Sequence, residues 1–134
     1  MFSHTAKPRA LGLASLLGLL PTMALASPPQ GAWRGLVQQA NSDVSIVVRF
    51  NAEAANVHFD EPFSCEVPAR LLKSDDTATV YRFSVSTNGG RFCDGLTGHN
   101  LTLTPASNGH LKIAFDTARN TWRGELSPPA APTP

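Results

Sequence analysis

The stretch VSIVVRF, residues 44–50, decides the fold class of this chain. Apolar side chains at positions 44, 46, 48 and 50 alternate with Ser45, Val47 and Arg49. Successive side chains of a β-strand point to opposite faces of the sheet, so this alternation predicts a strand with one buried face.

The same alternation recurs further along the chain. It is clear in residues 81–85 and 111–115 and shorter in residues 57–59 and 101–103. Turn-forming residues separate the runs, at positions 41–43, 51–53, 74–76, 88–90 and 107–109. We expect a hairpin turn at residues 88–90, and at most one helical turn at residues 51–56. Short strands separated in this way predict an all-β fold.

A repeated Trp-Arg-Gly string, at residues 33–35 and 122–124, suggests how the sheet is completed. On a strand, a tryptophan and the glycine two places on share a face, and a glycine beside a large ring helps to fix the register. Placing the first and last strands side by side removes both sheet edges. We therefore expect a small antiparallel closed barrel of about eight strands, with a two-sheet β-sandwich as the alternative. The closure residues are Trp33, Gly35, Trp122 and Gly124.

The ends of the 134-residue chain differ in composition from its middle. Residues 1–26 combine a basic start, an apolar core and the small-residue site Ala24-Leu25-Ala26, which predicts a signal peptide cleaved after Ala26. Gly12, Gly18 and Pro21 interrupt the apolar core, which disfavours a membrane anchor. We assign residues 27–31 to a linker, 32–126 to one β-barrel domain and the proline-rich residues 127–134 to a disordered tail. The expected location is the periplasm or the exterior.

Cys65 and Cys93 are the only two cysteines. Two thiols that enter an oxidising compartment usually pair, so we expect a disulfide between them. Closing a loop of about 28 residues stabilises a small domain by about 3.5 kcal/mol in the loop-entropy estimate. A catalytic thiol or a metal pair would need a reactive environment or further ligands, and the sequence reveals neither.

The charge of the chain is balanced. After position 26, nine Lys and Arg residues stand against ten Asp and Glu residues, spread along the sequence without a cluster. This balance argues against binding to nucleic acid or to an anionic membrane surface. The sequence has no second apolar span, so we expect no stable membrane span. We also expect the protein to be a monomer.

The order of several motifs resembles a recurrent type of small secreted bacterial β-domain. These motifs are Trp33-x-Gly35, a central Cys65, Cys93 followed by Asp-Gly, and a final Gly-x-Leu at residues 124–126. The resemblance covers most of residues 33–126. It implies a fold and no particular activity.

Gly31-Ala32-Trp33 also resembles the Gly-x-Trp that opens the first strand of lipocalins and related calycin barrels. That resemblance implies a barrel in which an arginine from a late strand packs over the tryptophan, here Arg119 or Arg123. A ligand cavity of this type would be lined from Trp33, Phe50, Tyr81, Phe83 and Phe115.

Few residues suggest chemistry. His58 and Asp60 share a strand face and are weak candidates for a metal site, which would need a third ligand from His99 or His110. The simpler explanation, which we prefer, is a polar solvent face that runs into a turn before Pro62. No nucleophile elbow, paired carboxylates on one face or phosphate-binding glycine loop is present. We therefore expect no catalytic residues and no cofactor.

The stretch NGGRFCDGLTG, residues 88–98, is the most unusual in composition, with four glycines around Cys93. A flexible loop anchored by a disulfide is a good place for binding residues. The candidates are Asn88, Arg91, Phe92 and Asp94. Two tight turns around a short strand would give the same composition without any binding role.

These features favour a non-enzymatic binding module of the bacterial periplasm or exterior. It would recognise another protein or an envelope component, for example as an inhibitor or immunity-type protein. The alternative is a calycin-like carrier of a small ligand. An enzyme would need His58, Asp60 and another histidine to converge in a cleft.

Overall fold

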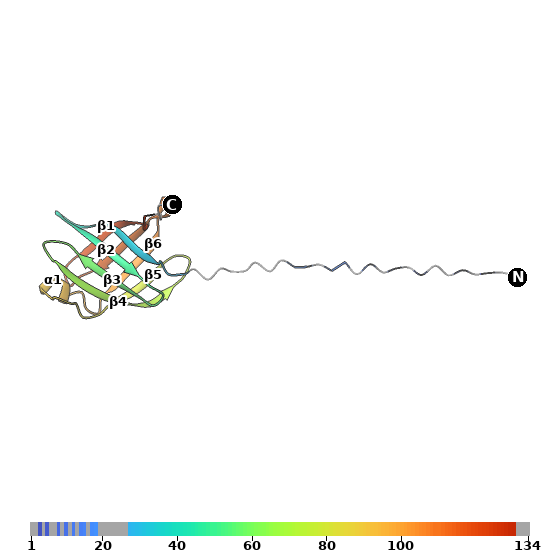
Figure 1. Cartoon of the computed structure of the whole chain (residues 1–134), viewed down its shortest axis with the longest axis horizontal. Coiled ribbons are helices and arrows are strands. Elements are labelled where there is room, and N and C mark those ends of the chain that lie inside the picture. Colours follow the sequence, from blue (N-terminus) through green and yellow to red (C-terminus); the bar gives the residue numbers. More distant parts are fainter. Residues whose placement is uncertain are drawn as a thin grey trace.

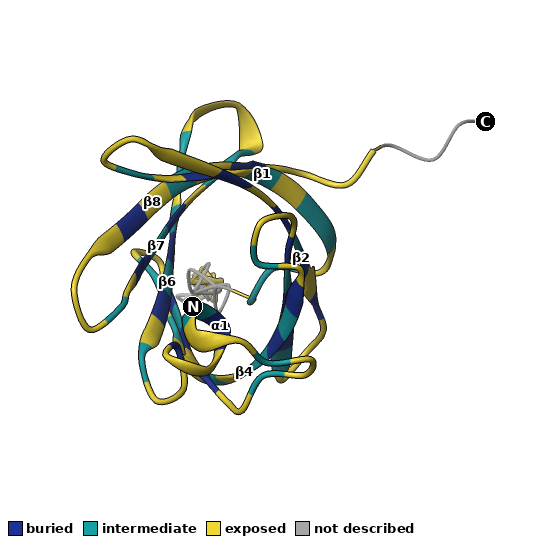
Figure 2. Ribbon diagram, turned by 90° about the vertical axis from the view of Figure 1, so that its left-hand side faces the viewer, coloured by how far each residue is buried: buried dark blue, intermediate teal, exposed yellow. Residues whose placement is uncertain are grey.

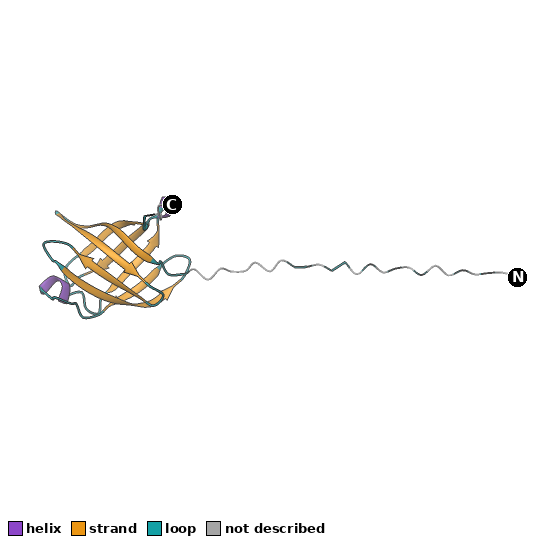
Figure 3. Ribbon diagram, viewed as in Figure 1, coloured by secondary structure: helices purple, strands orange, loops and turns teal. Residues whose placement is uncertain are grey.

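The computed structural model describes residues 27–130 continuously and, before them, only residues 3, 5, 8, 10, 12, 14, 15, 17 and 18. The expected cleavage site at residues 24–26 and the last residues of the expected tail, 131–134, lie outside the described residues. The described part forms a barrel with one short α-helix at one end (Figures 1 and 3). Its strands are β1 (Gly31–Gln39), β2 (Ser42–Phe50), β3 (Ala54–Phe59), β4 (Cys65–Ser74), β5 (Thr79–Phe83), β6 (Asn100–Pro105), β7 (Leu111–Asp116) and β8 (Thr121–Ser127).

The eight strands pair antiparallel in chain order and close into a barrel, which confirms the expected fold class over the sandwich alternative. The closing pair is β1 with β8, from Arg34 opposite Ser127 to Gln38 opposite Arg123. The sheet therefore closes through the two strands that carry Trp-Arg-Gly. The two tryptophans lie at opposite ends of this seam, because β1 and β8 run in opposite directions.

Alternating side chains fill the interior of the barrel. Along β2, Val44, Ile46, Val48 and Phe50 are buried, and the residues between them are more exposed. Large side chains such as Tyr81, Phe59, Phe83 and Phe115 are at most 2% exposed. A barrel of about eight strands is just wide enough for its own side chains to fill it. The core is a packed apolar cluster and holds the sheet in its closed form.

Strand β4 has no counterpart among the alternating runs of the sequence. Pro68 interrupts it, and the register shifts between Leu71 and Lys73. Proline offers no N–H to a sheet, but the Pro68 carbonyl accepts a hydrogen bond of 2.8 Å from the Ser84 N–H. The inward residues Cys65, Val67 and Ala69 still alternate.

The helical turn expected at residues 51–56 is wrong. The Asn51 side chain accepts hydrogen bonds from the N–H groups of Glu53 and Ala54, at 3.0 and 2.9 Å. These bonds make a tight turn, and strand β3 begins at Ala54. The asparagine competes locally with helix formation because its carboxamide satisfies the backbone donors.

The hairpin turn expected at residues 88–90 is also wrong. Strand β5 ends at Phe83, β6 begins at Asn100, and the segment between them contains the helix α1 (Arg91–Asp94). This segment, residues 84–99, lies at the end of the barrel that faces the viewer in Figure 2, and we call it the lid. Its Cys93 and Leu96 are buried in the core, at 1% and 0% exposure.

The lid is tied to the barrel by the predicted disulfide, which joins Cys93 to Cys65 at the start of β4. The bond is confirmed, and it is consistent with an extracytoplasmic protein.

The opposite end of the barrel carries both ends of the domain (Figure 1). A Cβ atom at Gly31 would lie 3.0 Å from the Pro129 side chain, so the entering and leaving segments touch. No helix in the described part of the chain is long and apolar enough to span a membrane.

Candidate functional site

The lid end of the barrel carries an open groove with an aromatic floor. It is built by the β3–β4 loop, the lid, the β7–β8 turn and the first residues of β8, and its volume is about 630 Å³. That volume is typical of ligand pockets. We call it the aromatic groove. Its lining residues are Phe63, Arg91, Phe92, Gly95, Thr117, Ala118, Arg119, Asn120 and Trp122.

Three aromatic rings of the groove pack against one another. Phe63 and Phe92 are stacked, with centroids 3.7 Å apart and planes at 7°. Trp122 meets both rings edge to face, at 6.1 Å from Phe63 and 5.5 Å from Phe92. Phe63 and Phe92 are half-buried, whereas Trp122 is only 4% exposed. The floor is therefore a fixed aromatic surface that is partly open to solvent.

The backbone around the groove is held firmly. In the lid, the Asp94 and Gly95 N–H groups donate to the carbonyls of Gly90 and Arg91, at 2.9 and 3.1 Å. In the β3–β4 loop, the Phe63 and Ser64 N–H groups both donate to the Asp60 carbonyl. Together with the disulfide, these bonds fix two walls of the groove.

The β7–β8 turn makes the third wall. The Thr117 N–H donates to the Asn120 carbonyl at 2.8 Å. The Thr117 hydroxyl accepts the N–H groups of Arg119 and Asn120, at 3.3 and 3.0 Å. A turn closed from both sides in this way fixes the backbone of Arg119 beside the groove.

Two of the four loop residues singled out in the sequence line the groove, namely Arg91 and Phe92. The other two lie elsewhere. Asp94 accepts a hydrogen bond of 2.5 Å from the Ser86 hydroxyl. Asn88 has a left-handed backbone conformation, with φ of 65°, in the bend before α1. Both shape the lid rather than face the groove.

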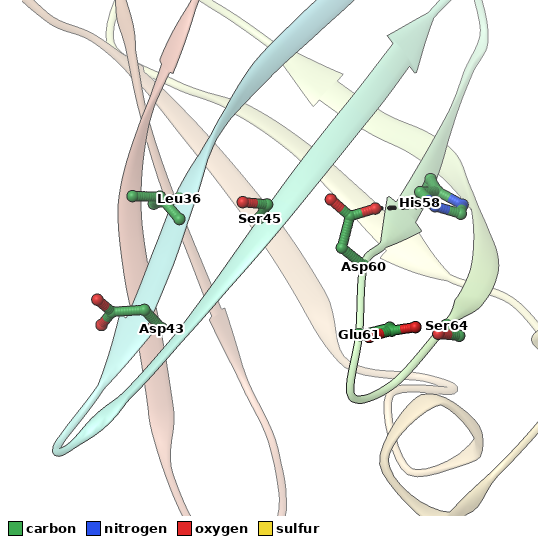
Figure 4. A pocket seen from close by; sticks show the side chains of 7 residues that line it. All are labelled: Leu36, Asp43, Ser45, His58, Asp60, Glu61 and Ser64. Carbon is green, nitrogen blue, oxygen red and sulfur yellow. Dashed lines mark ion pairs between the residues drawn. The ribbon is translucent and has the colours of Figure 1, made fainter.

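A second groove, on the outside of the barrel, is acidic (Figure 4). It has a volume of about 510 Å³ and lies over β1, β2, the end of β3 and the β3–β4 loop. Its lining contains three carboxylates and no lysine or arginine. The lining residues are Leu36, Asp43, Ser45, His58, Asp60, Glu61 and Ser64.

His58 and Asp60 are close together in this acidic groove but do not complete a metal site. The His58 Nε2 atom lies 3.2 Å from Asp60, and its Nδ1 atom lies 3.6 Å from Glu66. The two carboxylates flank opposite sides of the imidazole, so they do not converge on one point. His110 pairs instead with Glu125, at 2.8 Å. Within the described residues, no three His, Cys, Asp or Glu side chains are placed to hold a metal.

The closed barrel agrees with the lipocalin resemblance, but the arginine packed over the first tryptophan is not found in the described residues. Arg119 lies at the lid end and Trp33 at the other end, where the Trp33 indole N–H donates to the Gln30 carbonyl at 2.9 Å. Arg123 is paired opposite Gln38, well along β1 from Trp33, and is exposed. Neither arginine therefore packs over Trp33 in the way that the lipocalin resemblance implies.

Phe63, the β7–β8 turn and the floor position of Trp122 were not predicted from the sequence as parts of a site. One signal points to the first of these. Phe63 precedes Cys65 by two residues, and Phe92 immediately precedes Cys93. A disulfide between the cysteines brings both rings to one place, whereas the β7–β8 turn is brought there only by the closed barrel.

The chain was compared with family models, curated proteins and solved structures, and none of them matches it.

Proposed function

We propose that this chain is a non-enzymatic binding module that recognises another protein or an envelope component through the aromatic groove. The observation that carries the proposal is a fixed and partly exposed aromatic floor at one end of a rigid barrel. Aromatic anchors in preformed hollows dominate many protein interfaces, and a rigid scaffold loses little entropy on binding.

The positions of residues 27–31 and 127–130, which enter and leave the barrel, support the same proposal. The entering and leaving segments lie together at the end opposite the lid. A partner at the aromatic groove would therefore not collide with them. An inhibitor or immunity-type protein is one concrete form of such a module.

We also propose that the protein is exported to the periplasm or the exterior after cleavage behind Ala26. Support comes from the signal-like composition of residues 1–26 and from the disulfide. The intact mass of the exported protein tests this. A chain that begins at Ser27 is expected, and a full-length chain in the membrane fraction would contradict the proposal.

The alternative function, a calycin-like ligand carrier, has weaker support. Its cavity would be lined from the aromatic residues of the barrel interior. Phe83 and Phe115 instead pack edge to face at 5.8 Å, and Phe50 packs against Tyr81 at 5.7 Å. An interior filled in this way leaves the surface grooves as the sites for a ligand.

The function is tested by filling the aromatic groove with a bulky side chain. Ala118 is exposed on the β7–β8 turn and lines the groove, so Ala118→Tyr should block the groove without disturbing the core. Ala52 is exposed in the β2–β3 turn at the opposite end, and Ala52→Tyr is the matched control.

Wild-type and variant proteins are immobilised and exposed to an envelope extract. We expect a component that the wild type and Ala52→Tyr retain equally and that Ala118→Tyr loses by tenfold or more, about 1.4 kcal/mol of binding. Retention of the same components by all three proteins, or of none, would overturn the proposal.

A further inference from the structure

The two grooves of this protein have opposite charges. The aromatic groove is lined by Arg91 and Arg119 and by no carboxylate. The acidic groove has Asp43, Asp60 and Glu61 and no basic lysine or arginine. Although the domain as a whole is close to neutral, the aromatic groove is therefore locally basic.

Two acids that stand close to the groove residues in the sequence, Asp94 and Asp116, form no ion pair with Arg91 or Arg119 in the described part of the chain. Asp94 accepts the Ser86 hydroxyl at 2.5 Å, and Asp116 accepts the Thr121 hydroxyl at 2.7 Å. Within residues 27–130, the ion pairs join only His58 and His110 to carboxylates. Both arginines are exposed, so their guanidinium groups are available to an incoming partner.

We infer that the aromatic groove binds an acidic peptide segment of a partner protein, with an aromatic side chain on the Phe63–Phe92–Trp122 floor and carboxylates on Arg91 and Arg119. This inference rests on the proposed function and names the chemistry of the partner. Edge-to-face packing suits an aromatic anchor on a floor of rings. Guanidinium groups bind carboxylates through paired, directional hydrogen bonds.

The two arginines come from walls that are fixed independently. Arg91 begins α1, two residues before the disulfide-bonded Cys93. Arg119 lies in the turn closed by Thr117. The separation of their backbone positions is therefore set by the barrel and not by the ligand. An extended segment is favoured because its aromatic side chain and its carboxylates can reach separate points of one open groove.

The test uses short blocked peptides that contain one phenylalanine flanked by glutamates, by glutamines or by lysines. The chain has two tryptophans, Trp122 in the floor and Trp33 at the opposite end of the barrel. Their indole N–H resonances report binding separately. We expect the glutamate peptide to shift the Trp122 signal and to leave the Trp33 signal in place.

The glutamate peptide should bind about three- to tenfold more tightly than the glutamine peptide, as expected for two exposed charge pairs. The preference should fall with added salt. It should vanish in the Arg91→Gln and Arg119→Gln double variant. It should persist in the control Arg49→Gln and Arg82→Gln, which changes two exposed arginines outside the groove. Charge reversal by Arg91→Glu and Arg119→Glu should transfer the preference to the lysine peptide.

Equal shifts of Trp122 by the glutamate and glutamine peptides would overturn the inference and leave the proposed binding function standing. A shift of Trp33 alone, or no shift with any peptide, would also overturn it. The Ala118→Tyr capture experiment judges the proposed function separately, because it does not depend on the charge of the partner.

Discussion

Gly35 and Gly124 lie diagonally across the β1–β8 seam, and each leaves room for the backbone of the other strand. Gly35 is paired opposite Leu126, and Gly124 opposite Val37. A Cβ atom at Gly35 would overlap the carbonyl oxygen of Glu125, and one at Gly124 would overlap that of Leu36. The seam therefore has two positions, one on each strand, that have no room for a side chain.

Adding a methyl group at this seam should open it. We expect Gly35→Ala and Gly124→Ala each to lower the free energy of unfolding by about 1–3 kcal/mol or more, because the strands must move apart. Urea unfolding, followed by far-ultraviolet circular dichroism, measures the change from the midpoint and the slope.

Gly95→Ala is the matched control for the seam variants. Gly95 has an ordinary helical conformation, with φ of −69°. Its added Cβ atom would lie 3.1 Å from the Arg91 carbonyl oxygen, a contact that a small shift relieves. We expect a change well below that of the seam variants. Equal midpoints for all three variants would show that the close approach of the strands does not limit the fold.

The disulfide should stabilise the lid more than the rest of the barrel. Replacing both Cys65 and Cys93 with serine is expected to cost about 2–5 kcal/mol of unfolding free energy. The Leu96 N–H, which donates to the Cys93 carbonyl at 3.2 Å, should then exchange with solvent much faster than the amides of β3. Hydrogen exchange read by NMR compares the two regions.

The variant Leu96→Ala separates the contribution of the packed lid side chain from that of the disulfide. This variant keeps the disulfide but removes a side chain that is 0% exposed in the core, at an expected cost of about 2–5 kcal/mol. If loss of the disulfide speeds exchange uniformly across barrel and lid, the lid is not an independent unit.

The alternating runs predicted much of the fold, because burial of one face of a strand leaves a period of two. The runs beginning at Val44 and Leu111 match β2 and β7 closely. The Trp-Arg-Gly repeat pointed to the strands that form the seam. Strand β4 was not predicted from the sequence, because Pro68 and a register shift interrupt its alternating pattern. The helix α1 has only four residues, which is too short to show a helical period.

The candidate site was harder to predict than the fold. Its walls come from the neighbourhoods of Phe63, Arg91 and Arg119, which are far apart in the sequence. The composition of residues 88–98 pointed to Arg91 and Phe92. Nothing local marked the β7–β8 turn as part of the same surface, because the order of the strands and the closure of the barrel bring it there.

Tyr81 should make the protein sensitive to alkaline pH. Its hydroxyl is buried without a hydrogen-bond partner, and burial raises the pKa of Tyr81 to about 12 from a usual value near 10. The unfolded chain loses this proton first. Stability contributed by the neutral hydroxyl is therefore fully present below about pH 10 and is lost as the pH rises toward about 12.

Tyr81→Phe tests this dependence. We expect the variant to be at least as stable as the wild type at neutral pH, because it removes a buried hydroxyl that makes no hydrogen bond. Its stability should fall less between about pH 10 and 12. Tyr81 is the only tyrosine in the chain, so tyrosinate absorbance follows its ionisation directly. Ionisation of Tyr81 near pH 10 in the folded protein would contradict the prediction. An equal loss of unfolding free energy at alkaline pH in both proteins would also contradict it.

The two tryptophans should differ in their contribution to stability, although they occur in the same tripeptide. Trp122 is 4% exposed, and its ring lies parallel to that of Phe115, with the ring centroids 6.3 Å apart. Phe63 and Phe92 pack against it edge to face. Trp33 is half-buried, and its indole N–H is bonded to the exposed Gln30. Trp122→Ala should therefore cost about 3–5 kcal/mol, and Trp33→Ala about half of that or less.

Chemical unfolding of the two variants gives the comparison, and Trp122→Phe and Trp33→Phe act as conservative controls. The phenylalanine variants keep an aromatic ring, so each should recover part of the loss, more of it at Trp122, where the ring is more deeply buried. Trp122→Ala should also remove one of the three rings that form the floor of the aromatic groove, whereas Trp33→Ala should leave that groove intact. Larger destabilisation by Trp33→Ala would mean that the end opposite the lid, and not the lid end, contributes more to the stability of the barrel.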